Sequence, residues 1–192
     1  MKSKFRGLRL VASTATIAIA GAVGTVSFAQ ATSEVDDPEK LVIETDAGNQ
    51  LVSFSIDAIK KEFPVRERAT RTPWTTSGEI VRFRGVYLKD LLAKHHLDEH
   101  RAVEVRADDG FMARVPKEDI DSYAPMIAYE KECTDADRQN GKCDADDTYR
   151  QLDIDESGPF FVVWPYDKLP ASYIPARNNL WVWWVIAVRP VR

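Results

Sequence analysis

The sequence predicts an α+β domain that is built mostly from strands and has few, short helices. Two observations carry this prediction. Short apolar runs with period-two alternation recur along the chain and are separated by turn-forming residues, as in residues 102–106 followed by the turn at 108–110. Apolar residues with helical spacing, in contrast, occupy only brief segments such as residues 56–63 and 88–95.

The N-terminal residues have the organisation of a secretory signal peptide. Basic residues come first, an apolar run over residues 10–26 follows, and Ala29 and Ala31 are small residues of the kind that signal peptidase recognises. The alternative is a membrane anchor, but the run is short and glycines interrupt it. We therefore expect residues 1–31 to be removed and residues 32–192 to fold as a single domain in the periplasm.

The first half of this domain is expected to alternate between strands and short helices. Apolar runs bounded by Gly, Pro and Asn residues define each element. The expected elements are strands at 41–43 and 51–54, a helix at 56–63 that Ser55 caps and Pro64 ends, a strand-like segment at 65–72, an irregular loop at 72–75, a strand that starts at Val81 and breaks at Gly85, and a helix at 88–95.

The second half is expected to begin with a hairpin and to end with a buried strand. The expected elements are strands at 102–106 and 111–115 joined by an Asp-Gly turn, a helix at 117–123, strands at 125–129 and 160–164, a long loop at 165–179 and a closing strand at 180–188. If this last segment is a regular strand, Trp181 and Trp183 lie on one face and Trp184 on the other.

Residues 130–157 differ in character from the rest of the chain. They contain ten acidic and four basic residues together with Cys133 and Cys143, which are the only two cysteines. In an oxidising compartment, two cysteines this close in sequence are expected to form a disulfide, worth roughly 3 kcal/mol. We interpret the segment as a surface insertion that the disulfide pins, and as a solvated loop in preference to a partner-binding surface.

The charge of the chain argues against one class of function. Removal of residues 1–31 lowers the number of Lys and Arg residues from 26 to 22, against 30 Asp and Glu, so the mature net charge is −8. A nucleic-acid-binding protein would carry a basic surface instead.

The sequence shows no pair of residues typical of nucleophilic catalysis. The three histidines cluster within residues 95–100, away from an obvious Ser or Cys partner, and we predict no catalytic residues.

Several short segments occur in an order that is familiar. They are FRGVYLKDLL at 83–92, ADDGFMARVP at 107–116, MIAY at 126–129, GP at 158–159 and WVW at 181–183. This ordered set, over about residues 65–190, resembles the molybdopterin-binding oxidoreductase domain, which has the sulfite-oxidase fold. Within that fold the chain looks like a small exported group that consists of this domain alone. Some members of the group are thought to bind a pterin and to report it to a membrane-bound cyclic-di-nucleotide signalling enzyme.

One departure from the family concerns molybdenum. Sulfite-oxidase-type enzymes hold this metal through a cysteine thiolate, which should lie shortly before Trp74. Residues 65–75 contain no cysteine, and the hydroxyls of Thr70 and Thr72 are poor replacements for a soft thiolate. The signal peptide also lacks the twin arginines typical of cargo that is exported folded with its cofactor. We therefore predict no metal, and a pterin without molybdenum as the ligand.

The resemblance implies a set of ligand-binding residues. A pterin has a flat ring, an edge rich in N–H donors and a carbonyl, so its site needs an aromatic face, a carboxylate and a donor. We assign stacking to Trp74, the amino edge to Asp109, and the carbonyl or side chain to Arg177. The remaining ligand-binding residues implied by the resemblance are Phe111, Tyr166 and Trp181.

Each of these assignments has a plainer alternative. Trp74 could close one end of the core. Asp109 could serve only the turn that Asp-Gly favours, and Asp108 is a competitor for the carboxylate role. Arg177 could be a solvated loop residue.

For the whole protein, the alternative to a ligand-dependent signalling module is a molybdopterin-dependent oxidoreductase or its soluble partner. A third hypothesis is that the protein is an interaction domain with an empty pocket.

Overall fold

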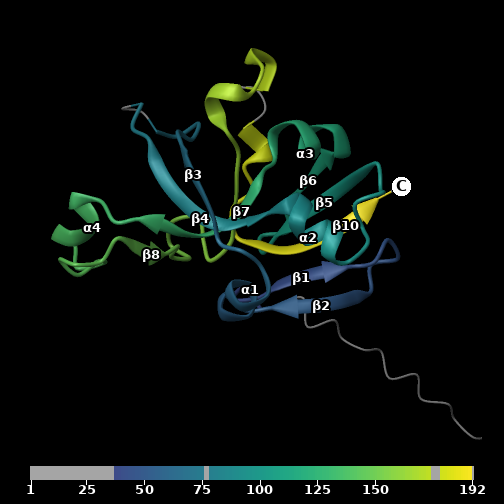
Figure 1. The fold of residues 1–192 in the computed structure, drawn as a ribbon, viewed down its shortest axis with the longest axis horizontal. Coiled ribbons are helices and arrows are strands. Elements are labelled where there is room, and N and C mark those ends of the chain that lie inside the picture. Colours follow the sequence, from purple (N-terminus) through teal and green to yellow (C-terminus); the bar gives the residue numbers. More distant parts are fainter. Residues whose placement is uncertain (1–36, 76–77, 174–177, 192) are drawn as a thin grey trace, which may run out of the picture. The chain divides into compact units, whose positions relative to one another are not determined.

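The computed structural model describes residues 37–75, 78–173 and 178–191, all within one compact unit, Ser33–Arg192. The predicted signal peptide, residues 1–31, lies outside the described residues. The unit is α+β and mostly β, as predicted, with ten strands in two sheets and four α-helices among the described residues (Figure 1). In this part of the chain no helix is long and apolar enough to cross a membrane.

The first sheet brings the two ends of the domain together. Its strand order is β2 (Gln50–Phe54), β1 (Leu41–Glu44), β10 (Val185–Val191), β5 (Ala102–Ala107) and β6 (Met112–Pro116). Strands β1 and β10 are parallel, and the other neighbours are antiparallel. The parallel pair is the longest connection in sequence, and it places the C-terminal strand at the centre of the sheet (Figure 1).

The second sheet is antiparallel and comes from the middle of the chain. Its order is β3 (Arg66–Thr70), β4 (Val81–Tyr87), β7 (Met126–Glu132) and β8 (Tyr149–Gln151), and β9 (Phe161–Val163) pairs with the first half of β7. Strand β7 therefore has two partners beside β4. Its N-terminal half pairs with β9 in the core, and its C-terminal half pairs with β8 within residues 130–157, which we call the acidic segment.

The helices are short and lie in the connections. They are α1 (Ile56–Glu62), α2 (Leu88–Lys94), α3 (Lys117–Tyr123) and α4 (Asp135–Gln139), with single 3₁₀ turns at Tyr166–Lys168, Ala171–Tyr173 and Asn178–Leu180. The predicted cap of α1 is confirmed, because Ser55 Oγ accepts a hydrogen bond from Ala58 N at 3.2 Å. The 3₁₀ turns lie in the segment that was predicted to be a long loop.

One hydrophobic cluster joins residues from both sheets and from helices α1, α2 and α3. Trp164 is its largest fully buried side chain, and its Nε1 donates to Leu180 O at 2.8 Å. Thr70 is buried beside it. Its hydroxyl lies 3.0 Å from Trp164 O and accepts a hydrogen bond from Tyr166 N at 2.9 Å. These contacts fix the start of the loop after β9 against the end of β3.

Gly85 does not break its strand, contrary to the prediction. Strand β4 passes through it and ends at Tyr87. A Cβ atom at Gly85 would lie 2.1 Å from the carbonyl oxygen of Ile127 on β7, and the register shifts between Arg84 and Gly85. The glycine therefore permits two backbones to approach closely, which is the other common role of a glycine within a strand.

The predicted closing strand also differs from the structure. Residues 181–184 are irregular, and β10 begins only at Val185. Trp184 has a φ of 51°, in the left-handed region that non-glycine residues seldom adopt. The alternation expected for Trp181, Trp183 and Trp184 therefore fails. Instead, all three residues line the same cleft.

Candidate functional site

A cleft lined mainly by aromatic side chains lies where the β5–β6 turn meets the segment before β10. Its volume is about 360 Å³. Its lining residues are Trp74, Ala107, Asp109, Phe111, Asn179, Trp181, Val182, Trp183 and Trp184. Five of these nine side chains are aromatic and one is a carboxylate. We call this the aromatic cleft.

The β5–β6 turn holds the carboxylate of Asp109 at the edge of the aromatic cleft. Gly110 adopts a φ of 83°, which the tight turn requires and which glycine adopts without strain. Asp109 Oδ1 accepts a hydrogen bond from Phe111 N at 2.9 Å. The side chain is exposed, and no described residue donates a hydrogen bond to Oδ2. The hydrogen bond that stabilises the turn therefore uses only one of the two carboxylate oxygens of Asp109.

Trp184 connects the Asp109 turn to the acidic segment. Its carbonyl accepts from Asp108 N at 2.9 Å, and its own N donates to Ser157 O at 3.1 Å. Its indole Nε1 donates to Ile154 O at 2.7 Å. Both its backbone and its side chain are therefore held by residues 154–157, and the turn that carries Asp109 is attached to the same residue.

Trp74 and Trp183 form one wall of the aromatic cleft. Their ring centroids are 4.7 Å apart with planes inclined by 60°, and Trp74 remains 42% exposed. Trp74 is therefore not a buried residue that closes one end of the core, which was the alternative interpretation of this position. Hydrogen bonds between Thr72 and Thr75 close the loop that carries it, with the two hydroxyl oxygens 2.9 Å apart.

Two indole nitrogens near the aromatic cleft have no partner. Nε1 of Trp181 and Nε1 of Trp183 are buried, and neither has a hydrogen-bond acceptor among the described residues. A buried donor without an acceptor costs free energy.

Tyr166 supports the cleft and does not line it. Its ring packs against that of Trp181 with centroids 6.3 Å apart, and the guanidinium of Arg71 lies 5.0 Å from the Tyr166 centroid. Arg71 also forms an ion pair with Asp167. Tyr166 therefore acts on the cleft only through Trp181, which is itself 3% exposed.

Of the six predicted ligand-binding residues, the aromatic cleft brings together four, which are Trp74, Asp109, Phe111 and Trp181. Arg177 lies outside the described residues. The prediction did not include Asn179, Trp183 or Trp184, which also line the cleft. The run of three tryptophans within residues 181–184 was the available signal, but the assumption of a regular strand hid its meaning.

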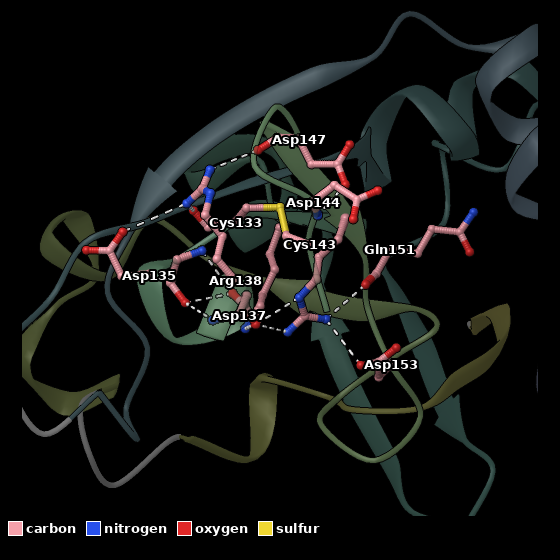
Figure 2. The surroundings of a disulfide bond; sticks show 12 residues. Cys133, Asp135, Asp137, Arg138, Cys143, Asp144, Asp147, Gln151 and Asp153 are labelled. Carbon is pink, nitrogen blue, oxygen red and sulfur yellow. Dashed lines mark hydrogen bonds and ion pairs between the residues drawn. A yellow bond between two sulfur atoms is a disulfide. The ribbon is translucent and has the colours of Figure 1, made fainter. Parts of the chain in front are cut away.

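The predicted disulfide between Cys133 and Cys143 is present and buried. The surrounding segment is not a solvated loop, contrary to the prediction. Strand β7 extends into it, α4 and β8 lie within it, and Thr134 caps α4 in a reciprocal arrangement with Asp137. Figure 2 shows Arg138 beside the disulfide, where it donates to the carbonyls of Cys133 and Asp147.

A buried arginine organises the acidic segment. The Arg150 side chain is only 7% exposed. Its Nη2 lies 2.6 Å from an oxygen of Asp137 and 2.7 Å from one of Glu156, and its Nη1 lies 3.3 Å from Asp153. Figure 2 labels two of these carboxylates, Asp137 and Asp153, below the disulfide. The arginine thus compensates three carboxylates at once.

Two lysines complete this charged network. Lys131 Nζ lies 3.3 Å from Glu156, and Lys142 Nζ lies 2.8 Å from Asp153. Burial alone raises the pKa of Asp137, but hydrogen bonds from Arg150 and Thr134 outweigh it and lower that pKa well below its usual range. A hydrogen bond from Lys142 likewise lowers the pKa of Asp153. The network is therefore fully ionised near neutral pH.

A larger depression lies elsewhere on the domain but lacks the chemistry of a ring-binding site. It has a volume of about 410 Å³ between the start of α1 and residues 151–154. Carboxylates of Glu39, Asp57 and Asp153 line it, and none of its lining residues is aromatic. Volume alone does not identify a site, so the aromatic cleft is the better candidate.

Comparison with known proteins adds no assignment. No protein-family profile matches the chain, and no curated protein is significantly similar to it. Among the described residues, no three His, Cys, Asp or Glu side chains are grouped in a way that could hold a metal ion. The aromatic cleft is therefore the feature of the molecule that indicates a function.

Proposed function

We propose that this chain is a periplasmic pterin-binding protein of the sulfite-oxidase fold, and that the aromatic cleft holds the pterin. In this proposal the liganded protein regulates a membrane-bound partner, such as a cyclic-di-nucleotide signalling enzyme. The observation that carries the proposal is the composition of the cleft, in which five aromatic side chains surround a single carboxylate.

The cleft offers an aromatic face and a carboxylate, two of the groups that a pterin requires. Its volume of about 360 Å³ falls in the range of small-molecule sites. Trp74 and Phe111 are more than two-fifths exposed, so each offers a ring face for stacking. The Asp109 carboxylate can accept paired N–H bonds from the amino edge.

The residues present do not fit a molybdenum centre. The chain has two cysteines, and they are joined to each other, so neither offers a thiolate. The hydroxyls of Thr70 and Thr72, the possible oxygen substitutes, are both occupied: Thr70 bonds to the backbone of Trp164 and Tyr166, and Thr72 bonds to the Thr75 hydroxyl. The soft sulfur ligand that this metal takes in the family is therefore missing, and we derive no redox step.

The test is to identify the small molecule that the native protein carries. The protein is purified from the periplasm and denatured, and the released material is analysed by fluorescence and mass spectrometry, with elemental analysis for molybdenum on the same sample. We expect a pterin from the wild type, much less from Trp74→Ala, and no stoichiometric molybdenum. Stoichiometric molybdenum would favour the oxidoreductase alternative, and no pterin release or uptake by either protein would overturn the proposal.

A further inference from the structure

A second cluster of side chains lies on β3, at the end of β4 and at the start of α2, and it carries excess positive charge. The Tyr87 ring centroid is 5.4 Å from the guanidinium carbons of both Arg66 and Arg68 and 5.8 Å from Lys89 Nζ. One carboxylate is present, because Asp90 pairs with Arg66 at 3.1 Å. We call these five residues the Tyr87 cluster. It holds three cations and one anion in a protein that is otherwise acidic.

Arg68 differs from the other arginines on β3 and β4. Arg66, Arg82 and Arg84 each pair with a carboxylate. Arg68 has no carboxylate within 4.0 Å in the described part of the chain. Its Nη2 donates to the carbonyl of Ala124 at 2.7 Å, while its Nε is buried with no acceptor there.

The position of Arg68 leaves its charge uncompensated. The side chain is half-buried, and burial lowers the pKa of its guanidinium. A partly desolvated cation costs free energy unless an anion pairs with it. Lys89, which likewise has no carboxylate partner among the described residues, adds a second uncompensated charge beside it.

The backbone next to these cations is also unpaired. Strand β3 lies at the end of its sheet and pairs only with β4. Within the described residues, no other segment makes a hydrogen bond to the backbone of residues 66–70. An edge strand presents N–H and C=O groups that can pair with an added strand.

We propose that the β3 edge and the Tyr87 cluster together bind an extended acidic segment of a partner protein. The backbone of that segment pairs with β3, and its carboxylates pair with Arg68, Lys89 and Arg66. Because side chains alternate along a strand, Arg66 and Arg68 share one face of β3 while Glu67 faces the other way. The segment therefore carries carboxylates at every second position, with uncharged or basic residues between them.

Protection of the edge is a simpler role for charged residues on β3, because charges discourage edge-to-edge association. That role accounts for Arg66 and Glu67, which have intramolecular partners of opposite charge. It does not require an arginine whose charge is half-buried and unpaired. Arg68 is therefore the residue that distinguishes partner binding from edge protection.

The test uses fluorescein-labelled peptides and fluorescence anisotropy with the mature protein at low salt. The probe is a peptide of alternating Asp and Thr that is long enough to span β3. Two control peptides have the same composition. One places all the Asp residues before all the Thr residues, and the other keeps the alternation but carries an N-methyl group on every backbone amide, so that neither of its edges can pair with a strand.

We expect the alternating peptide to bind about tenfold more tightly than either control, because only it combines register with backbone pairing. Arg68→Gln should weaken its binding by about tenfold, whereas Lys61→Gln, which removes an exposed cation on α1, should leave it unchanged. Arg68→Gln should change the melting temperature little, because it removes an uncompensated charge together with the hydrogen bond to Ala124 O.

Three results would overturn the proposal. The first is equal affinity for all three peptides, which would indicate nonspecific charge attraction. The second is an Arg68→Gln variant that binds the alternating peptide as the wild type does. The third is complete displacement of the peptide by free glutamate at the same carboxylate concentration, which would assign the Tyr87 cluster to a small anion. None of these readouts depends on whether the aromatic cleft binds a pterin.

Discussion

The acidic segment and the aromatic cleft use polar groups in opposite ways. In the acidic segment, Arg150 and its carboxylate partners satisfy one another, and the arginine is almost fully buried. In the aromatic cleft, one oxygen of the exposed Asp109 carboxylate has no partner in the described chain, and the rings of Trp74 and Phe111 are more than two-fifths exposed. Groups that stabilise a fold are paired within it, whereas groups that await a ligand are left open.

The two regions are nevertheless joined at one residue. Trp184 lines the aromatic cleft, and its two N–H groups donate to carbonyls of Ile154 and Ser157 at the end of the acidic segment. The acidic segment therefore holds the Trp184 wall of the aromatic cleft in place. Changes in the charged network should first affect stability and only then ligand binding, whereas changes at Asp109 should affect ligand binding alone.

The largest expected effect follows removal of the buried cation. Arg150→Met would leave the buried Asp137 and the partly buried Glu156 without their principal partner, and we expect a loss of about 3–5 kcal/mol in the free energy of unfolding. Arg82→Met is the matched control, because the Arg82 side chain is 53% exposed in its pair with Glu132 and should cost at most about 1 kcal/mol. Urea unfolding measures both. Equal losses in the two variants would show that Arg150 does not organise the segment.

Removal of the disulfide should cost less. Replacing Cys133 and Cys143 together with alanine releases a short loop in the unfolded chain, and we expect a loss of about 3 kcal/mol in the same unfolding experiment. The charged network remains to hold α4 and β8 in place. If this double variant is less stable than Arg150→Met, the disulfide stabilises the acidic segment more than the charged network does.

A smaller effect should appear as the pH falls. The pKa values of Asp137, Asp153 and Glu156 are lowered in the folded protein, so the stability that these groups provide is complete above their unfolded pKa values near about 4. It is lost as the pH falls through the lower, folded values. The melting temperature should therefore decrease below about pH 4, and less steeply in Arg150→Met. Parallel curves for the two proteins would contradict this account.

Local patterns in the sequence predicted much of the fold. The hairpin around Asp109-Gly110, the Ser55 cap and most strands follow from alternation and turn chemistry. Contacts between distant residues were not predictable in this way. The strand through Gly85 depends on how closely β7 approaches it, and the network around Arg150 depends on three carboxylates that a composition count treats as solvated charge.

The candidate site was predictable to a similar extent. The family resemblance selected Trp74, Asp109, Phe111 and Trp181, and these residues line one cleft. It could not place Trp183 and Trp184, because the left-handed backbone at Trp184 interrupts the strand that alternation assumes. The side chains that line the cleft in addition to the predicted ones come from this irregular segment.

The most direct test of the central claim is a titration of the mature protein with a reduced pterin, followed by tryptophan fluorescence, in the wild type, Asp109→Asn and Asp108→Asn. Asparagine at 109 keeps the oxygen that accepts from Phe111 N but removes the charge. We predict that Asp109→Asn binds the pterin about 10- to 100-fold more weakly, with an unchanged melting temperature, and that Asp108→Asn binds as the wild type does. Equal affinity in all three proteins, or no binding by any of them, would contradict the claim that the aromatic cleft recognises a pterin through Asp109.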